Sequence, residues 1–165
     1  MLRLLATALV ATPLVAAAAP PAAGVSVGVA GCVEAVSGNP PAGRGPIKFF
    51  EYRGWAESAV EKPDGTWDVK MGAAVRGGDP VTVRVVPRHQ DRAALVYGGR
   101  TPRSAVRFEP CADHTRSTGW AGGVRLTKLR RFTVEIRMGD EAPIREVLLD
   151  LPRGFAPSAG SDGGG

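Results

Sequence analysis

Clusters of glycine and proline interrupt this chain at short intervals, and they limit its fold more than any other feature. Glycine supplies positive φ and proline fixes its own φ, so each cluster predicts a turn. With 22 glycines and 14 prolines in 165 residues, the sequence excludes long helices and favours many short elements. The clearest clusters are Gly38-Asn39-Pro40-Pro41, Pro63-Asp64-Gly65, Gly77-Gly78-Asp79-Pro80, Gly98-Gly99, Gly122-Gly123 and Gly139-Asp140-Glu141-Ala142-Pro143.

Between these turns, apolar and polar residues alternate with the period of a β-strand. Val81, Val83 and Val85 are predicted to face a core, and so is the Phe132–Met138 segment at every second position. Asp64-Gly65 predicts a hairpin turn. The predicted strands are Val25–Val36, Ile47–Arg53, Trp55–Glu61, Thr66–Val75, Val81–Val86, Ala93–Tyr97, Ala105–Pro110, Val124–Leu129, Phe132–Met138 and Ile144–Leu151.

This pattern predicts an all-β domain, an antiparallel β-sandwich of immunoglobulin-like or Greek-key architecture. A small closed barrel is the alternative. Cys32, Trp55 and Cys111 follow the immunoglobulin order, but Glu109 stands where a tyrosine corner needs tyrosine. We therefore predict the architecture and not membership of that family.

The N-terminus has the form of an export signal. Arg3 precedes an uncharged, largely apolar stretch that ends in small residues, and this predicts a signal peptide over residues 1–18. A retained membrane anchor is the alternative, which Pro13 and the alanine content disfavour. We expect an Ala/Pro linker over 19–24, one β-sandwich domain over 25–154 and a flexible Gly/Ser tail over 155–165.

The two cysteines, Cys32 and Cys111, are predicted to form one disulfide, because an even count in an oxidising compartment favours a bridge. Val29-Ala30-Gly31-Cys32 also resembles the lipobox of bacterial lipoproteins, in which the cysteine carries a lipid. A lipidated Cys32 cannot form a disulfide, so the two interpretations exclude each other.

Motifs for catalysis are missing from the sequence. The two histidines, His89 and His114, lack a second histidine at metal-binding spacing, so no metal or cofactor is predicted. No nucleophile motif or phosphate loop occurs, and Asp64, Asp79 and Asp140 are explained by turns. Carboxylates gathered from loops into a glycan-cleaving site stay open as an alternative.

Candidate binding residues are one tryptophan and a basic segment. Trp55 and Trp67 are expected to pack as hairpin partners. Trp120 lies between glycines in a predicted loop and is the best candidate for an exposed tryptophan that stacks on a sugar; the alternative is that its indole covers glycines beside the disulfide. Arg125, Lys128, Arg130 and Arg131 would attract an anionic polymer or lipid headgroups, unless they only form a solvated face. The net charge of +5 is spread along the chain, which does not indicate nucleic-acid binding.

One segment resembles uncharacterised exported proteins of high-GC Gram-positive bacteria. Phe108-Glu109-Pro110-Cys111, followed by Gly119-Trp120-Ala121-Gly122-Gly123-Val124, is similar to their pattern of a strand ending in Pro-Cys before a Gly-Gly turn and another strand. Leu129-Arg130-Arg131 stands where those proteins place a further cysteine, so their disulfide pairing does not carry over. The resemblance implies export and no particular activity.

We therefore expect an exported, non-enzymatic β-sandwich in the cell envelope or outside the cell, with a cell-wall glycan or anionic envelope polymer as partner. The alternatives are a secreted glycan-acting hydrolase and a lipoprotein tethered through Cys32.

Overall fold

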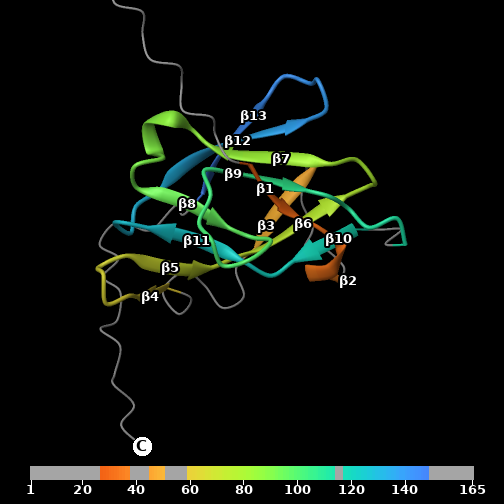
Figure 1. Cartoon of the computed structure of the whole chain (residues 1–165). Coiled ribbons are helices and arrows are strands. Elements are labelled where there is room, and N and C mark those ends of the chain that lie inside the picture. Colours follow the sequence, from red (N-terminus) through yellow and green to blue (C-terminus); the bar gives the residue numbers. More distant parts are fainter. Residues whose placement is uncertain (1–26, 38–44, 51–58, 114–116, 149–165) are drawn as a thin grey trace, which may run out of the picture.

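The computed structural model describes residues 27–37, 45–50, 59–113 and 117–148 (Figure 1). The predicted signal peptide, the linker over 19–24 and the tail over 155–165 lie outside the described residues, as do Trp55 and His114.

The described chain is all-β, as predicted, and its strands form three sheets. Sheet A has the order β1-β9-β7-β12-β13, sheet B the order β2-β10-β6-β3, and sheet C the order β4-β5-β11-β8. The strands are β1 (Val27–Ala30), β2 (Ala35–Ser37), β3 (Ile47–Phe50), β4 (Ala59–Glu61), β5 (Trp67–Lys70), β6 (Gly72–Arg76), β7 (Val81–Val85), β8 (Ala93–Val96), β9 (Ala105–Phe108), β10 (Ser117–Trp120), β11 (Gly123–Leu126), β12 (Phe132–Met138) and β13 (Ile144–Leu148). Two 3₁₀ turns, η1 (Cys32–Glu34) and η2 (Pro87–His89), complete the set.

Sheets B and C are two halves of one bent sheet. The pairing of β10 with β6 continues into the pairing of β11 with β5 without a change of register, from Trp120 opposite Ala73 to Gly123 opposite Lys70. At the bend, the Met71 amide donates to the Gly122 carbonyl at 2.9 Å. The buried Tyr97 hydroxyl donates to the Met71 carbonyl at 2.7 Å and holds the bend against the core.

Sheet A packs over this bent sheet, an arrangement consistent with the predicted β-sandwich. Valines of β7 and alternate residues of β12 share one hydrophobic core with Leu95 and Trp120 of the other layer. A backbone bridge between Leu95 and Arg103 connects β8 to the chain that enters β9. All pairings among the described strands are antiparallel except that of β1 with β9, which is parallel.

The turn chemistry is confirmed at the predicted Asp64-Gly65 hairpin and at the predicted turn that begins with Gly139. Gly65 adopts φ +75° between β4 and β5, and the Thr66 amide donates to the Asp64 carboxylate at 2.9 Å. Gly139 adopts φ +52° between β12 and β13. The prediction of one continuous strand over Val25–Val36 is wrong, because η1 separates β1 from β2 where the chain forms the disulfide.

Candidate functional site

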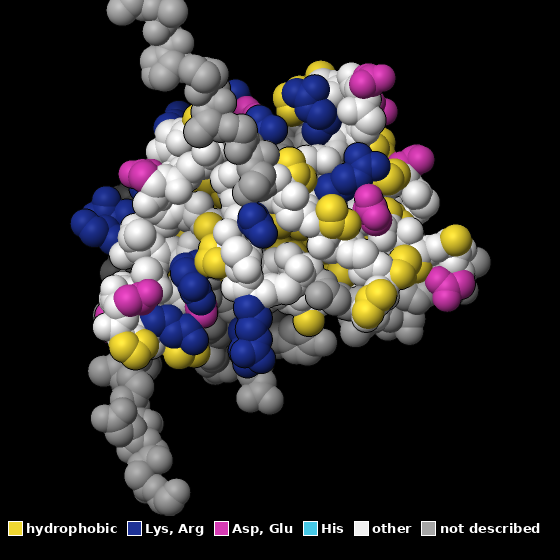
Figure 2. Space-filling view, viewed as in Figure 1, with side chains coloured by type: hydrophobic (Ala, Val, Ile, Leu, Met, Phe, Trp, Pro, Cys, Tyr) yellow, Lys and Arg dark blue, Asp and Glu magenta, His cyan; other side chains and the backbone are white. Residues whose placement is uncertain are grey.

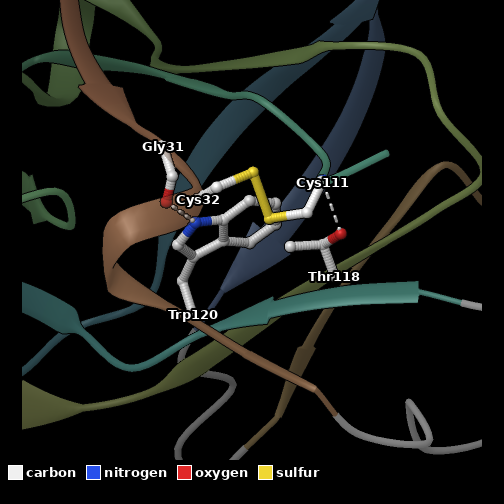
Figure 3. Close-up of a disulfide and its surroundings, with 5 residues drawn as sticks. All are labelled: Gly31, Cys32, Cys111, Thr118 and Trp120. Carbon is white, nitrogen blue, oxygen red and sulfur yellow. Dashed lines mark hydrogen bonds between the residues drawn. A yellow bond between two sulfur atoms is a disulfide. The ribbon is translucent and has the colours of Figure 1, made fainter. Parts of the chain in front are cut away.

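The predicted disulfide between Cys32 and Cys111 is present and closes a loop of 79 residues (Figure 3). Cys32 is exposed, whereas Cys111 is 5% exposed. The Cys111 amide donates to the Thr118 hydroxyl at 2.9 Å, so β10 also holds the buried end of the bridge.

The expectation that Trp120 is exposed in a loop is wrong. Trp120 ends strand β10 and is 1% exposed. Its indole N–H donates to the Gly31 carbonyl at 3.0 Å, beside the disulfide (Figure 3). Its ring packs edge to face against that of Phe108, with the ring centroids 5.2 Å apart. A tryptophan so placed is part of the core and cannot stack on a ligand in this conformation.

Arg125 is held in an internal ion pair on the outer face of sheet C. Its Nε and Nη2 donate to the two carboxylate oxygens of Asp68, directly opposite on β5, at 2.7 and 2.9 Å. These hydrogen bonds lower the pKa of Asp68 and raise the pKa of Arg125. Lys62 lies 3.3 Å from the same carboxylate. Arg125 therefore stabilises the sheet, and its charge is largely matched within the protein.

The remaining predicted basic residues lie free at one end of the domain. Lys128, Arg130 and Arg131 are exposed in the connection between β11 and β12, and none of them forms an ion pair with a described residue. Leu129 packs against the core between them and fixes the loop. These three side chains are therefore accessible to solvent, as both the binding patch and the solvated face considered above require.

The fold brings two further arginines to this loop. The Thr127 amide donates to the Arg92 carbonyl at 3.0 Å, so the segment after η2 lies beside the β11–β12 connection (Figure 1). Arg88 is carried by η2 itself. We call Arg88, Arg92, Lys128, Arg130 and Arg131 the basic end; Asp91 is the single carboxylate that the two segments, 87–92 and 127–131, contain.

His89 locks η2 against β12 and so positions the basic end. Its Nδ1 accepts a hydrogen bond from the Thr133 amide at 2.9 Å, which requires the neutral imidazole. Burial lowers the pKa of His89, and the nearby Arg92 and Arg88 lower it further. The Gln90 side-chain amide donates to the Val85 carbonyl at 2.8 Å and anchors the same turn.

Arg92 has a buried side-chain donor with no hydrogen-bond partner among the described residues. Its Nε is buried and makes no hydrogen bond within the described part of the chain. Its backbone carbonyl accepts the hydrogen bond from the Thr127 amide, which fixes the position of the residue. Arginine's guanidinium carries several donors and suits planar or tetrahedral anions.

Acidic side chains gather at the opposite end of sheet A. A hollow of about 350 Å³ between the turn before β7 and the turn after β12 is lined by Asp79, Asp140, Glu141 and Arg107, among others. Over the face seen in Figure 2, Lys and Arg side chains lie interspersed with Asp and Glu. The two segments of the basic end, by contrast, contain five basic residues and one carboxylate.

Comparison of the chain with protein-family models, with curated proteins and with solved structures finds no match. Within the described residues, no helix is long and apolar enough to cross a membrane, and no three His, Cys, Asp or Glu side chains are grouped to hold a metal ion.

Proposed function

We propose that this protein is exported and binds an anionic polymer of the cell envelope through its basic end, without catalysing a reaction. The observation that carries the proposal is the convergence of five basic side chains from two segments about 40 residues apart, Arg88 and Arg92 with Lys128, Arg130 and Arg131. A concentrated charge of one sign raises the local concentration of a polyanion and attracts it over about a Debye length.

Export is supported by two features that agree with each other. The first 18 residues have the pattern of a cleaved signal peptide, and the chain carries a disulfide, which persists in oxidising compartments. We infer that the exported domain is a Greek-key, immunoglobulin-like sandwich, because the connections from β6 through β10 pass repeatedly from one layer to the other.

The lipoprotein alternative conflicts with the packing around Cys32. Lipidation would use the sulfur that bonds to Cys111. Cleavage before Cys32 would also remove β1, whose Ala30 is fully buried in the core, and Gly31, whose carbonyl accepts the indole N–H of Trp120. Removal of these residues would leave a buried donor unsatisfied.

The hydrolase alternative has its best location in the hollow lined by Asp79, Asp140 and Glu141. No tryptophan lines that hollow in the described residues, and Arg107 occupies it together with the carboxylates. A sugar-cleaving site needs a carboxylate pair facing a bound sugar ring. The basic end favours binding over hydrolysis.

The proposal is tested by titrating the protein with inorganic polyphosphate at two salt concentrations and measuring the binding by isothermal titration calorimetry. We expect binding that weakens with salt, and an affinity reduced about tenfold or more in the Arg130→Gln/Arg131→Gln variant, since each basic side chain near an anionic surface contributes about 1 kcal/mol. Arg107→Gln/Arg145→Gln removes the same charge from strands and is the matched control. Equal losses in both variants would mean that net charge, and not the basic end, determines binding.

A further inference from the structure

The outer face of sheet C carries a trough of about 290 Å³ that runs across all four of its strands. Its floor is made of valine, alanine and glycine, and two lysines and one aspartate stand at its border. The lining residues are Val60, Lys62, Asp68, Val69, Lys70, Val96, Gly99, Ala121, Gly122, Gly123 and Val124.

Gly123, the first residue of the inner strand β11, forms part of the floor of the trough. Gly123 lies opposite Lys70 on one side and Val96 on the other, and it fills none of the space between them. A Cβ atom at Gly123 would lie 2.1 Å from the Val69 carbonyl oxygen, so the backbone itself excludes a side chain. A glycine is therefore required at this position in the floor of the trough.

The border of the trough offers both hydrogen-bond donors and an acceptor. Lys70 is exposed and forms no ion pair within the described residues, and Lys62 is half-buried 3.3 Å from Asp68. Arg125 holds Asp68 ionised, as its lowered pKa indicates. An apolar floor with polar groups on one side suits a ligand that has an apolar face and polar edges.

We infer that the trough holds one ring of a carboxylated sugar within the anionic polymer, an inference that rests on the proposed function. The C–H face of a pyranose can lie on Val60, Val96 and the glycines, its carboxylate can reach Lys70, and a hydroxyl can donate to Asp68. The volume, at the lower end of the range for small-molecule sites, fits one ring better than a large ligand. A fatty-acid chain is disfavoured because the trough is open to solvent and bordered by charges.

The position of the trough connects it with the basic end. Gly123 and Arg125 belong to β11, which leads directly into the loop that carries Lys128, Arg130 and Arg131. Lys128 is the second residue after the end of β11. A polymer with one sugar ring in the trough can therefore extend along β11 and place further anionic groups over the basic end.

The test measures the binding of two probes to the unmodified protein and to two kinds of variant. Binding is detected by changes in amide chemical shifts and by calorimetry. The probes are a galacturonate hexasaccharide, which carries carboxylated sugars, and inorganic polyphosphate, which has no sugar. Val96→Trp fills the trough and Lys70→Gln removes a border charge, while Val147→Trp places the same side chain on the exposed edge strand β13 as the matched control. Thermal unfolding confirms that each variant is folded.

We expect the hexasaccharide to shift the amides of Lys70, Gly122 and Gly123, and polyphosphate to shift only the basic end. Lys70→Gln is expected to weaken hexasaccharide binding about tenfold, the effect of one charge-assisted hydrogen bond. Val96→Trp is expected to weaken hexasaccharide binding by at least the same factor. Both variants should bind polyphosphate as tightly as the unmodified protein does. Maltohexaose, a neutral sugar, should bind too weakly to compete.

Unchanged hexasaccharide binding in Lys70→Gln and Val96→Trp would overturn the sugar site while leaving the polyanion proposal intact. Failure of polyphosphate to bind the unmodified protein would overturn the proposed function instead. Equal binding of maltohexaose and the galacturonate hexasaccharide would show that the carboxylate is not recognised, which also contradicts this inference.

Discussion

Removal of the disulfide should lower the free energy of unfolding by about 4.5 kcal/mol. The bond links residues 79 positions apart, and in the chain-entropy model a loop of this length removes about 15 cal/mol/K from the unfolded chain. For a domain of this size the loss corresponds to a melting temperature lower by roughly 15 to 20 °C. The nearby hydrogen bonds, from the Cys111 amide to the Thr118 hydroxyl and from the Trp120 indole to the Gly31 carbonyl, do not require the disulfide. The effect should therefore fall mainly on the unfolded state.

Urea unfolding of a Cys32→Ser/Cys111→Ala variant measures this loss. Serine suits the exposed Cys32, and alanine avoids burying a hydroxyl at Cys111, which is 5% exposed. Besides the lower midpoint, we expect a larger dependence of unfolding free energy on urea, because the unlinked chain exposes more surface when it unfolds. The unmodified protein measured with reductant is the control for packing changes.

A loss below about 2 kcal/mol with no change in the urea dependence would refute the entropic argument. It would mean that the unfolded chain keeps its ends close without the bond. Agreement between the variant and the reduced protein would assign the loss to the cross-link, since no side chain differs in the second case.

Three smaller changes test particular contacts. Gly122→Ala should destabilise the domain by about 1–3 kcal/mol, because the added Cβ would lie 2.2 Å from a buried tyrosine ring, whereas Gly78→Ala meets nothing within 4 Å and should be nearly neutral; thermal unfolding compares them. Trp120→Phe removes the hydrogen bond to Gly31 and should cost about 1–3 kcal/mol by urea unfolding, and a neutral result would show that the indole N–H is not needed. His89 stabilises the fold in its neutral form, and its folded-state pKa is lowered, so this contribution is complete above the ordinary value of about 6.5 and declines as the pH falls below it. His89→Asn keeps an acceptor and should flatten the pH dependence of the melting temperature between pH 7 and the onset of carboxylate titration.

Local patterns were sufficient to predict much of the fold. The alternation in β7 and β12 correctly gave the buried valines, and Asp64-Gly65 correctly gave a hairpin, because both features act between residues close in sequence. The disulfide was predicted from the even cysteine count together with the expectation of export. None of these predictions required knowing which strands distant in sequence are neighbours in the sheets.

Strand β10 was missed for a tertiary reason. Ser117, Thr118 and Gly119 have no apolar alternation, so the segment resembles a loop in sequence. The strand forms because β2 and β6 pair with it on both sides, and this central position buries Trp120. Tertiary pairing thus outweighs local propensity, as it commonly does in sheets.

The basic segment from Arg125 to Arg131 shows that residues clustered in sequence can differ in the structure: some form ion pairs within a sheet and others do not. Within strands, register places a carboxylate beside an arginine: Asp68 is opposite Arg125, and Glu135 is opposite Arg145. In the loop after β11 there is no opposite strand, so Lys128, Arg130 and Arg131 keep their charge free among the described residues. Arg88 and Arg92 join them through one backbone hydrogen bond, from Thr127 to Arg92, which no spacing in the sequence encodes. The two loops that meet at the basic end therefore bring together basic side chains that are available to a ligand.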